Sequence, residues 1–131
     1  MLISTKGRYA LRVMIDLADH STGDFITLKD IADRQGISEK YLESIIVLLS
    51  KAGLLEGLRG KGGGYRLNRA PADYSVGEIL RLVENTMAPV SCLDCNSNGC
   101  DRSAECRTLS VWQNLQERID EYLDSVSLAD L

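Results

Sequence analysis

The chain has 131 residues, of which 44% are hydrophobic and 26% are charged. This length fits one compact unit, and the ordinary globular composition excludes a disordered or fibrous chain. It has no apolar run of the roughly 18 residues that a membrane helix needs, and it does not begin with a basic stretch followed by an apolar core. We therefore expect a cytoplasmic protein that has no membrane partner.

The net charge of −4 is unevenly distributed along the sequence. Residues 1–70 hold 11 Lys and Arg against 8 Asp and Glu, whereas residues 71–131 hold 4 against 11. DNA affinity depends on cations that converge on one face rather than on net charge, so the first half can meet phosphate. A solvated surface with a chance asymmetry accounts for the same numbers, and charge alone does not decide between the two.

The first half has the pattern of a helix-turn-helix. Apolar residues at helical spacing predict helices over residues 5–20, 28–35 and 39–51. Thr27 and Ser38 are placed to cap the second and third helices, and Gly36 predicts the turn between them. In such a motif the second helix of the pair enters the major groove, although many other helical pairs share this pattern.

Two short strands, over residues 54–58 and 65–67, are predicted to flank a basic, glycine-rich stretch. Glycines let a backbone approach a sugar-phosphate chain, and Arg59 or Lys61 can enter a narrow minor groove. A nucleotide phosphate loop is disfavoured, because no Lys-Ser or Lys-Thr follows the glycines and a strand rather than a helix comes next. The pattern favours the wing of a winged helix, with a plain flexible hairpin as the alternative.

All four cysteines fall between residues 92 and 106, among Gly, Asn, Ser and Asp: Cys92, Cys95, Cys100 and Cys106. Their C-x2-C-x4-C-x5-C spacing suits a loop that wraps thiolates around a soft metal centre. Disulfides would need an oxidising compartment, and polar neighbours disfavour inert buried cysteines. Zinc is the rival of iron and sulfide here, because four thiolates satisfy its tetrahedral preference.

The remaining segments predict two more helices. Ser75 and Glu78 predict a capping box that opens a short helix packing on the first region. A long acidic helix follows the cysteines, with apolar residues three and four apart: Leu109, Trp112, Leu115, Ile119, Leu123 and Val126. It would reach past a small winged-helix body, which makes a two-fold helix-helix dimer plausible.

These patterns predict a mainly α fold with a small β-hairpin. We expect a winged helix-turn-helix DNA-binding region over residues 1–74, followed by a helix and a cysteine-rich sensor loop over residues 75–107. Residues 108–131 are then the dimerisation helix.

Four motifs, in residues 6–10, 35–43, 59–65 and 76–79, carry a resemblance that covers essentially the whole chain. Together they resemble the Rrf-type winged-helix transcriptional regulators, the bacterial family of IscR, NsrR, RirA and CymR. The resemblance implies a homodimeric transcription factor, usually a repressor, that binds double-stranded DNA. It also implies that cluster-bearing members change their DNA affinity or site choice when the cluster is gained, lost or oxidised.

The resemblance implies three ligands of a 2Fe-2S or 4Fe-4S iron-sulfur cluster: Cys92, Cys100 and Cys106. The fourth ligand does not transfer, because Leu109 replaces the histidine of one branch and Arg8 replaces the partner-subunit carboxylate of another. Cys95 is the expected replacement. Three oxygen ligands are alternatives: Asp94, Asp101 and Glu105. Zinc or an empty, metal-free loop is the alternative to a cluster.

The resemblance places DNA-reading residues on the third helix and in the hairpin: Ser38, Lys40, Tyr41, Glu43, Ser44, Arg59 and Gly60, joined by Lys61 from its chemistry. Glu43 can accept from cytosine amino groups, and the other helix residues offer phosphate or base contacts. Plain surface solvation is the alternative for each. A zinc-stabilised winged helix that binds protein is the alternative function, and no enzyme is expected because the lone His20 lacks a paired nucleophile.

Overall fold

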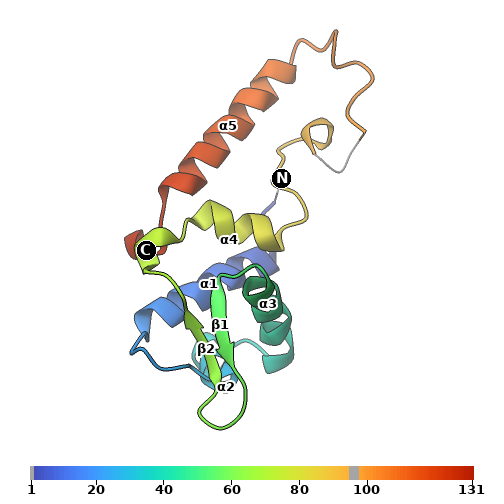
Figure 1. The fold of residues 1–131 in the computed structure, drawn as a ribbon. Helices are drawn as coiled ribbons and strands as arrows, with labels where there is room; N and C mark the ends of the chain where they lie inside the picture. Colours follow the sequence, from blue (N-terminus) through green and yellow to red (C-terminus); the bar gives the residue numbers. More distant parts are fainter. Residues whose placement is uncertain (1, 95–97) are drawn as a thin grey trace.

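The computed structural model describes residues 2–94 and 98–131. Four helices and a hairpin form one body, from which a further helix extends (Figure 1). The elements in chain order are α1 Thr5–Asp19, α2 Leu28–Gln35, α3 Glu39–Lys51, β1 Leu55–Leu58, β2 Gly64–Leu67, α4 Val76–Val83 and α5 Leu109–Ser125. Short 3-10 turns cover Pro71–Asp73, Ser91–Leu93 and Leu128–Asp130. No helix in the described part of the chain is long and apolar enough to cross a membrane.

The predicted helix boundaries of the first half are confirmed to within a residue or two. Thr27 accepts a hydrogen bond from the Asp30 N–H at 3.1 Å, and Ser38 accepts one from the Tyr41 N–H at 3.2 Å. Each of these bonds satisfies a backbone donor that the first turn of a helix leaves unpaired. Gly36 ends α2 in the left-handed region, with φ of 65°, and so turns the chain into α3.

The core lies where α1 packs against α2, α3 and α4. Its fully buried side chains come from all four helices and from the chain just before β1 and before α4: Val13, Met14, Leu17, Ile31, Leu42, Ile45, Ile46, Leu49, Leu54, Tyr74 and Ile79. These residues follow the apolar stripes of the sequence, which is why the amphipathic pattern predicts the packing.

The hairpin pairs β1 and β2 antiparallel, with Leu55 opposite Leu67 and Leu58 opposite Gly64. A third segment joins its edge, because Ile26 and Tyr65 exchange backbone hydrogen bonds of 2.8 and 2.7 Å. Gly64 has φ of 148°, and a Cβ there would lie 2.2 Å from the Ile26 carbonyl oxygen. The absence of a side chain at Gly64 therefore lets the hairpin pack against the backbone of Ile26.

The predicted capping box at the start of α4 is only half right. The Glu78 N–H does donate to the Ser75 hydroxyl at 3.0 Å. The Glu78 carboxylate, however, accepts from Arg69 at 3.0 and 3.1 Å instead of capping the Ser75 N–H. A bidentate, charge-assisted pair is stronger than one bond from a neutral N–H, so the arginine takes the carboxylate.

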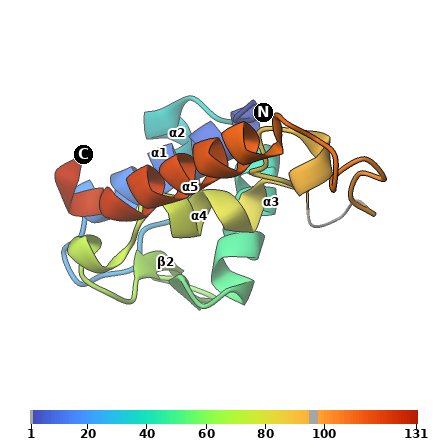
Figure 2. The same ribbon diagram turned by 90° about the horizontal axis from the view of Figure 1, so that it is seen from above.

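The helix α5 lies on the side of α4 that faces away from the hairpin (Figures 1 and 2). Arg81 on α4 holds it, donating to Asp124 at 2.7 Å and to Asp120 at 3.2 Å. Gly77 permits this approach, since a Cβ at Gly77 would lie 2.2 Å from the Asp124 carboxylate. None of the α5 residues is buried in the single chain, as expected for a helix that extends beyond the body.

Candidate nucleic-acid interface and cysteine segment

The exposed face of α3 carries four of the five helix residues that the sequence predicts to contact DNA: Ser38, Lys40, Glu43 and Ser44. The opposite face of the helix is buried in the core. The Ser38 hydroxyl caps the helix, and the Ser44 hydroxyl donates to the Tyr41 carbonyl oxygen at 2.6 Å. Lys40 and Glu43 therefore present the charged groups of this face.

Tyr41, the fifth residue, is placed differently. It is half-buried, and its ring meets the Tyr9 ring of α1 edge-on with centroids 5.8 Å apart. Arg12 lies 5.0 Å from the centre of the same Tyr9 ring. Such aromatic and cation-π contacts are directional, so Tyr41 fixes α3 against α1 whatever else it contacts.

The hairpin tip presents the three predicted wing residues, Arg59, Gly60 and Lys61, to solvent. Gly60 has φ of 90° and its carbonyl accepts from the Gly63 N–H at 3.0 Å, which closes the turn. A groove runs between α3 and the hairpin, lined by Thr27, Leu28, Val47, Ser50, Lys51, Gly57, Leu58, Arg59, Gly60, Gly63, Gly64 and Tyr65. The end of α3, through Val47, Ser50 and Lys51, and the cationic tip thus border one hollow, whereas the predicted DNA-contacting residues of α3 do not line it.

A buried carboxylate holds α1 and α2 together behind this face. Asp16, whose side chain is fully buried, accepts from Arg34 at 2.7 and 3.0 Å and from Gln35 at 2.8 Å. Burial alone would raise the pKa of Asp16, but the bonds from Arg34 and Gln35 outweigh it and leave the pKa below its ordinary value. Arg12 completes the cluster by donating to the Gln35 side chain at 3.1 Å and to its carbonyl oxygen.

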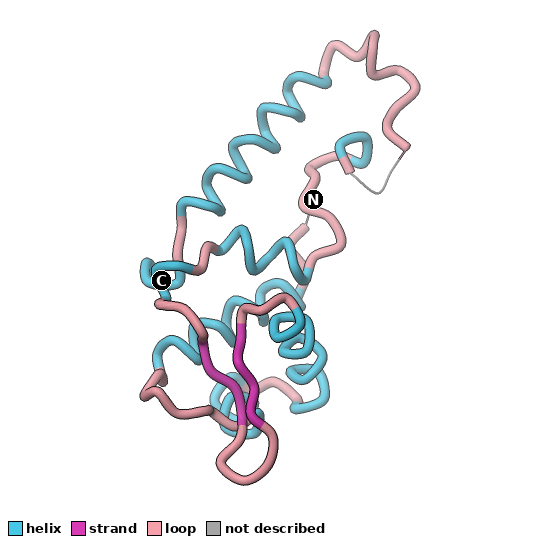
Figure 3. The backbone as a smooth tube through the Cα atoms, viewed as in Figure 1, coloured by secondary structure: helices cyan, strands magenta, loops and turns pink. Residues whose placement is uncertain are grey.

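The cysteine segment lies between α4 and α5, and its residues 84–94 and 98–108 are loop apart from the short helical turn Ser91–Leu93 (Figure 3). Cys92 is half-buried in that turn and lines one hollow together with Cys100. Cys106 is exposed just before α5, and its sulfur lies 3.3 Å from the Thr108 hydroxyl. That hydrogen bond, aided by backbone N–H groups of Thr108 and Leu109, lowers the pKa of Cys106. All three thiols are free of disulfides.

A glutamate that sequence analysis missed ties this segment to the first helix. Glu84 ends α4, and its carboxylate accepts from the Ser4 N–H at 2.9 Å and from the Ser4 hydroxyl at 2.8 Å. A Cβ at Gly7 would lie 2.1 Å from the same carboxylate. A carboxylate beside a helix N-terminus is favoured by the helix dipole, so Glu84 fixes the start of α1 where the cysteine segment begins.

Comparison with known proteins decides the family. The sequence profile of the Rrf2 family, described as an iron-dependent transcriptional regulator, matches residues 3–131. This chain belongs to the Rrf2 family. It is 40% identical over its full length to the HTH-type transcriptional regulator IscR of Aliivibrio salmonicida, and covers 77% of that protein. The corresponding regulator of Vibrio cholerae is 39% identical and 75% covered.

Solved structures of the Rrf2 family agree. The structure of T. potens IscR matches 99% of this chain and is itself 85% covered, with 44% identity and a TM-score of 0.77. CymR, the global cysteine regulator of B. subtilis, is 36% identical, with 99% and 95% coverage and a TM-score of 0.78. The predicted resemblance and the mainly α, winged-helix fold are therefore confirmed.

The Rrf2 cysteine segment offers suitable donors for a soft metal centre, because three free thiols are present and one has a lowered pKa. Among residues 2–94 and 98–131, however, no three His, Cys, Asp or Glu side chains lie close enough to hold a metal ion. Cys95, the expected fourth ligand, lies outside the described residues. The thiol donors therefore suit a soft metal centre, but the segment would have to close around it. The ligand set stays a prediction.

Proposed function

We propose that this Rrf2-family regulator is a cytoplasmic homodimer that represses transcription by binding double-stranded DNA through α3 and the hairpin tip. The observation that carries the proposal is the groove that Lys51 of α3 and Arg59 of the hairpin tip line together. Lys40 and Glu43 are exposed on the same helix. Charged groups on a helix suit the major groove, and a cationic tip suits the negative potential of a narrow minor groove. Lys61 adds a second cation beside Arg59.

The cysteine segment is proposed to hold an iron-sulfur cluster of the 2Fe-2S or 4Fe-4S type. Cys92, Cys100 and Cys106 would supply three thiolates, and Cys95 the fourth. When bound, such a cluster supplies a centre that gains and loses electrons and that oxygen destroys. Cys106 directly precedes α5, so its ligation would draw the start of this helix toward the rest of the segment.

The second subunit is proposed to pack on α5. Three of its apolar side chains are exposed in the single chain, with Leu115 at 42%, Val111 at 54% and Tyr122 at 67%. Ile119 and Leu123 of the predicted seam are half-buried. An unpartnered apolar face of this kind is what an isologous interface covers, and a two-fold dimer would present two α3 helices to a two-fold DNA site.

One preparation tests both the DNA and the cluster proposals. Protein purified without oxygen should contain iron and acid-labile sulfide, and it should enrich a duplex from a randomised DNA pool. Binding of that duplex should weaken steeply as salt rises, because cations displace counterions from phosphate. Stoichiometric zinc without iron would contradict the cluster but leave DNA binding intact. Zinc together with a failure to enrich any duplex would favour the alternative, a zinc-stabilised module that binds protein.

A further inference from the structure

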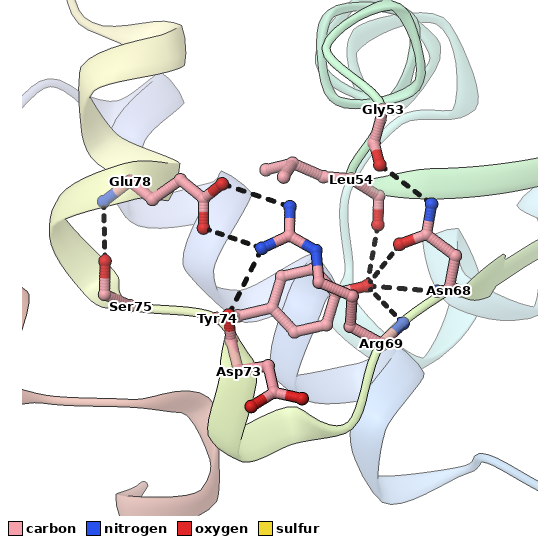
Figure 4. Close-up of polar contacts among 8 residues, drawn as sticks. All are labelled: Gly53, Leu54, Asn68, Arg69, Asp73, Tyr74, Ser75 and Glu78. Atoms are coloured by element: carbon pink, nitrogen blue, oxygen red, sulfur yellow. Dashed lines mark hydrogen bonds and ion pairs between the residues drawn. The ribbon is translucent and has the colours of Figure 1, made fainter.

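The base of the hairpin is fastened by one buried side chain, Tyr74 (Figure 4). Its hydroxyl donates to the Leu54 carbonyl oxygen at 2.8 Å, directly before β1. The same hydroxyl accepts from the N–H groups of Asn68 and Arg69 at 3.0 and 3.1 Å, directly after β2. Asn68 adds a bond to the Gly53 carbonyl oxygen at 2.8 Å. Both strands of the wing therefore leave the body at the Tyr74 hydroxyl.

Arg69 links the ring of Tyr74 to α4. The Arg69 guanidinium lies 4.6 Å from the ring centre of Tyr74 and makes the bidentate pair with Glu78 in the first turn of α4. Figure 4 shows this arginine between the ring and the glutamate. A cation held over a ring face restricts how the ring tilts, so α4, Tyr74 and the hairpin base share one set of contacts.

The chain that follows α5 docks at the same place. The Val76 N–H donates to the Val126 carbonyl oxygen at 2.9 Å, and the Leu128 N–H donates to the Tyr74 carbonyl oxygen at 3.0 Å. Leu128 itself is buried in the core at 4% exposure. The helices α4 and α5 consequently meet beside Tyr74 and diverge toward the cysteine segment, as Figure 1 shows.

We propose that Tyr74, supported by Arg69 and Glu78, is a positioning site that sets the wing relative to α3 and passes movement of the α4–α5 pair to the wing. The cysteine segment joins the open ends of these two helices, while their closed ends lie against the residue that fastens the hairpin. A change in the segment that alters the angle between α4 and α5 therefore pivots at the base of the wing.

The part of this proposal that concerns DNA rests on the proposed function, but its mechanical part does not. The two can be measured separately with Tyr74→Phe, which keeps the ring and removes the hydroxyl. Its control is Ser110→Ala, which also removes one hydroxyl, from an exposed residue of α5.

Hydrogen-deuterium exchange of the full-length chain reads the mechanical part. Tyr74→Phe should speed exchange at Asn68 and Arg69, throughout the strands 55–67, and in the docked chain 126–128, with α3 unchanged. Ser110→Ala should leave all of these at the wild-type rate. Faster exchange confined to the two amides that lose their acceptor would overturn the proposal, because the hydroxyl would then be only a local bond.

Titration of the duplex enriched by the wild type reads the DNA part. Tyr74→Phe should weaken binding about fivefold to tenfold, the range expected for one neutral hydrogen bond, and Glu78→Gln should weaken it in the same direction. If Tyr74→Phe folds poorly, Glu78→Gln decides, since that carboxylate is partly exposed. If a folded Tyr74→Phe or Glu78→Gln variant binds the duplex as tightly as Ser110→Ala does, the positioning role is contradicted.

The link between α5 and the wing has its own test, in which a residue after α5 is substituted and hydrogen exchange is measured in the hairpin. Leu128→Ala should speed exchange in residues 55–67, whereas Leu131→Ala, at a leucine that is 59% exposed, should not. If both substitutions act through one contact, their effects on DNA affinity should not add. The double variant Tyr74→Phe/Leu128→Ala should then bind the duplex about as tightly as whichever single variant binds less tightly. Additive losses would overturn the link. If the wild type enriches no duplex, only the proposed function is contradicted. The exchange results then still test the positioning site.

Discussion

Arg34 on α2 donates hydrogen bonds of 2.7 and 3.0 Å to the two carboxylate oxygens of the buried Asp16 on α1. Gln35 adds a third bond to the same carboxylate at 2.8 Å. This relationship joins the first helix to the helix-turn-helix, so the position of α3 depends on a charge that is fully enclosed by its partners.

Asp16→Asn should lower the free energy of unfolding by about 2 to 3 kcal/mol, because the charge-assisted bonds from Arg34 are lost. The folded pKa of Asp16 lies below its ordinary value of 3.8. The stability contributed by the carboxylate is therefore full above about this pH and is lost as pH falls through the folded pKa. Urea unfolding at neutral and acid pH measures this. Asp19→Asn, at an exposed position on the same helix, is the control, and a constant difference between the two variants down to low pH would contradict the assignment.

Gly64→Ala should destabilise the hairpin more than Gly62→Ala does. Both glycines have a positive φ, of 148° at Gly64 and 76° at Gly62. They differ in space, because a Cβ at Gly64 would lie 2.2 Å from the Ile26 carbonyl oxygen, whereas a Cβ at Gly62 would meet nothing within 4 Å. The left-handed conformation alone costs roughly 1 kcal/mol for alanine. Thermal unfolding of both variants checks the order, and equal losses would mean that the contact with Ile26 yields at no cost.

The local signals in the sequence predicted the first three helices well. The caps Thr27 and Ser38 and the turn at Gly36 act within four residues, so each leaves a readable pattern. Tyr74 left none, because its hydroxyl bonds to Leu54, 20 residues earlier. Hydrogen bonds across such a separation exist only once the chain has folded.

The same distinction explains the outcome at α4. Ser75 and Glu78 form the local half of a capping box, but Arg69 takes the carboxylate from nine residues away. The cysteine spacing likewise predicts which side chains would be donors, while the arrangement of the thiols depends on the metal they would enclose. Local chemistry was predictable from these residues, and the choice between competing partners was not.

Arg59→Ala should lower the affinity for the enriched duplex by roughly 1 to 3 kcal/mol, through lost attraction to phosphate or to the minor groove. Fluorescence anisotropy at two salt concentrations measures the effect. Arg118→Ala, at a side chain that is 83% exposed on α5, removes the same charge away from the groove and should bind like the wild type. Equal affinity of the two variants would make the wing an ordinary hairpin.

Leu115→Asp should convert the protein to a monomer, because it places a charge in the proposed apolar seam of α5. Light scattering at micromolar concentration measures the mass. Asn114→Asp adds the same charge next to this residue, on the exposed side lined by Asn114, Glu117, Arg118 and Glu121, and should leave the dimer intact. A wild type that is already monomeric would contradict the interface.

Each of Cys92→Ala, Cys100→Ala and Cys106→Ala should abolish the brown colour expected of the protein purified without oxygen, because each removes a proposed thiolate. Visible absorption and iron content measure the loss. Cys95→Ala tests the fourth position, since an unchanged spectrum would exclude this thiol and leave a carboxylate or an external ligand. Leu109→His is the reverse experiment and should restore a cluster to the Cys95 variant.

The arginine clamp between α4 and α5 affects how any salt titration of this protein is interpreted. Arg81 and its two aspartates are all partly exposed, with side-chain exposures of 39%, 40% and 50%. Salt weakens exposed pairs of this kind slightly at 0.1 M, where the Debye length is about 10 Å, and more strongly toward 1 M, where it falls to about 3 Å. Raising the salt therefore loosens the interhelical clamp while it also weakens the attraction to phosphate. The apparent number of ions released on binding would contain both contributions, and only differences between variants that keep Arg81 report the phosphate contacts alone.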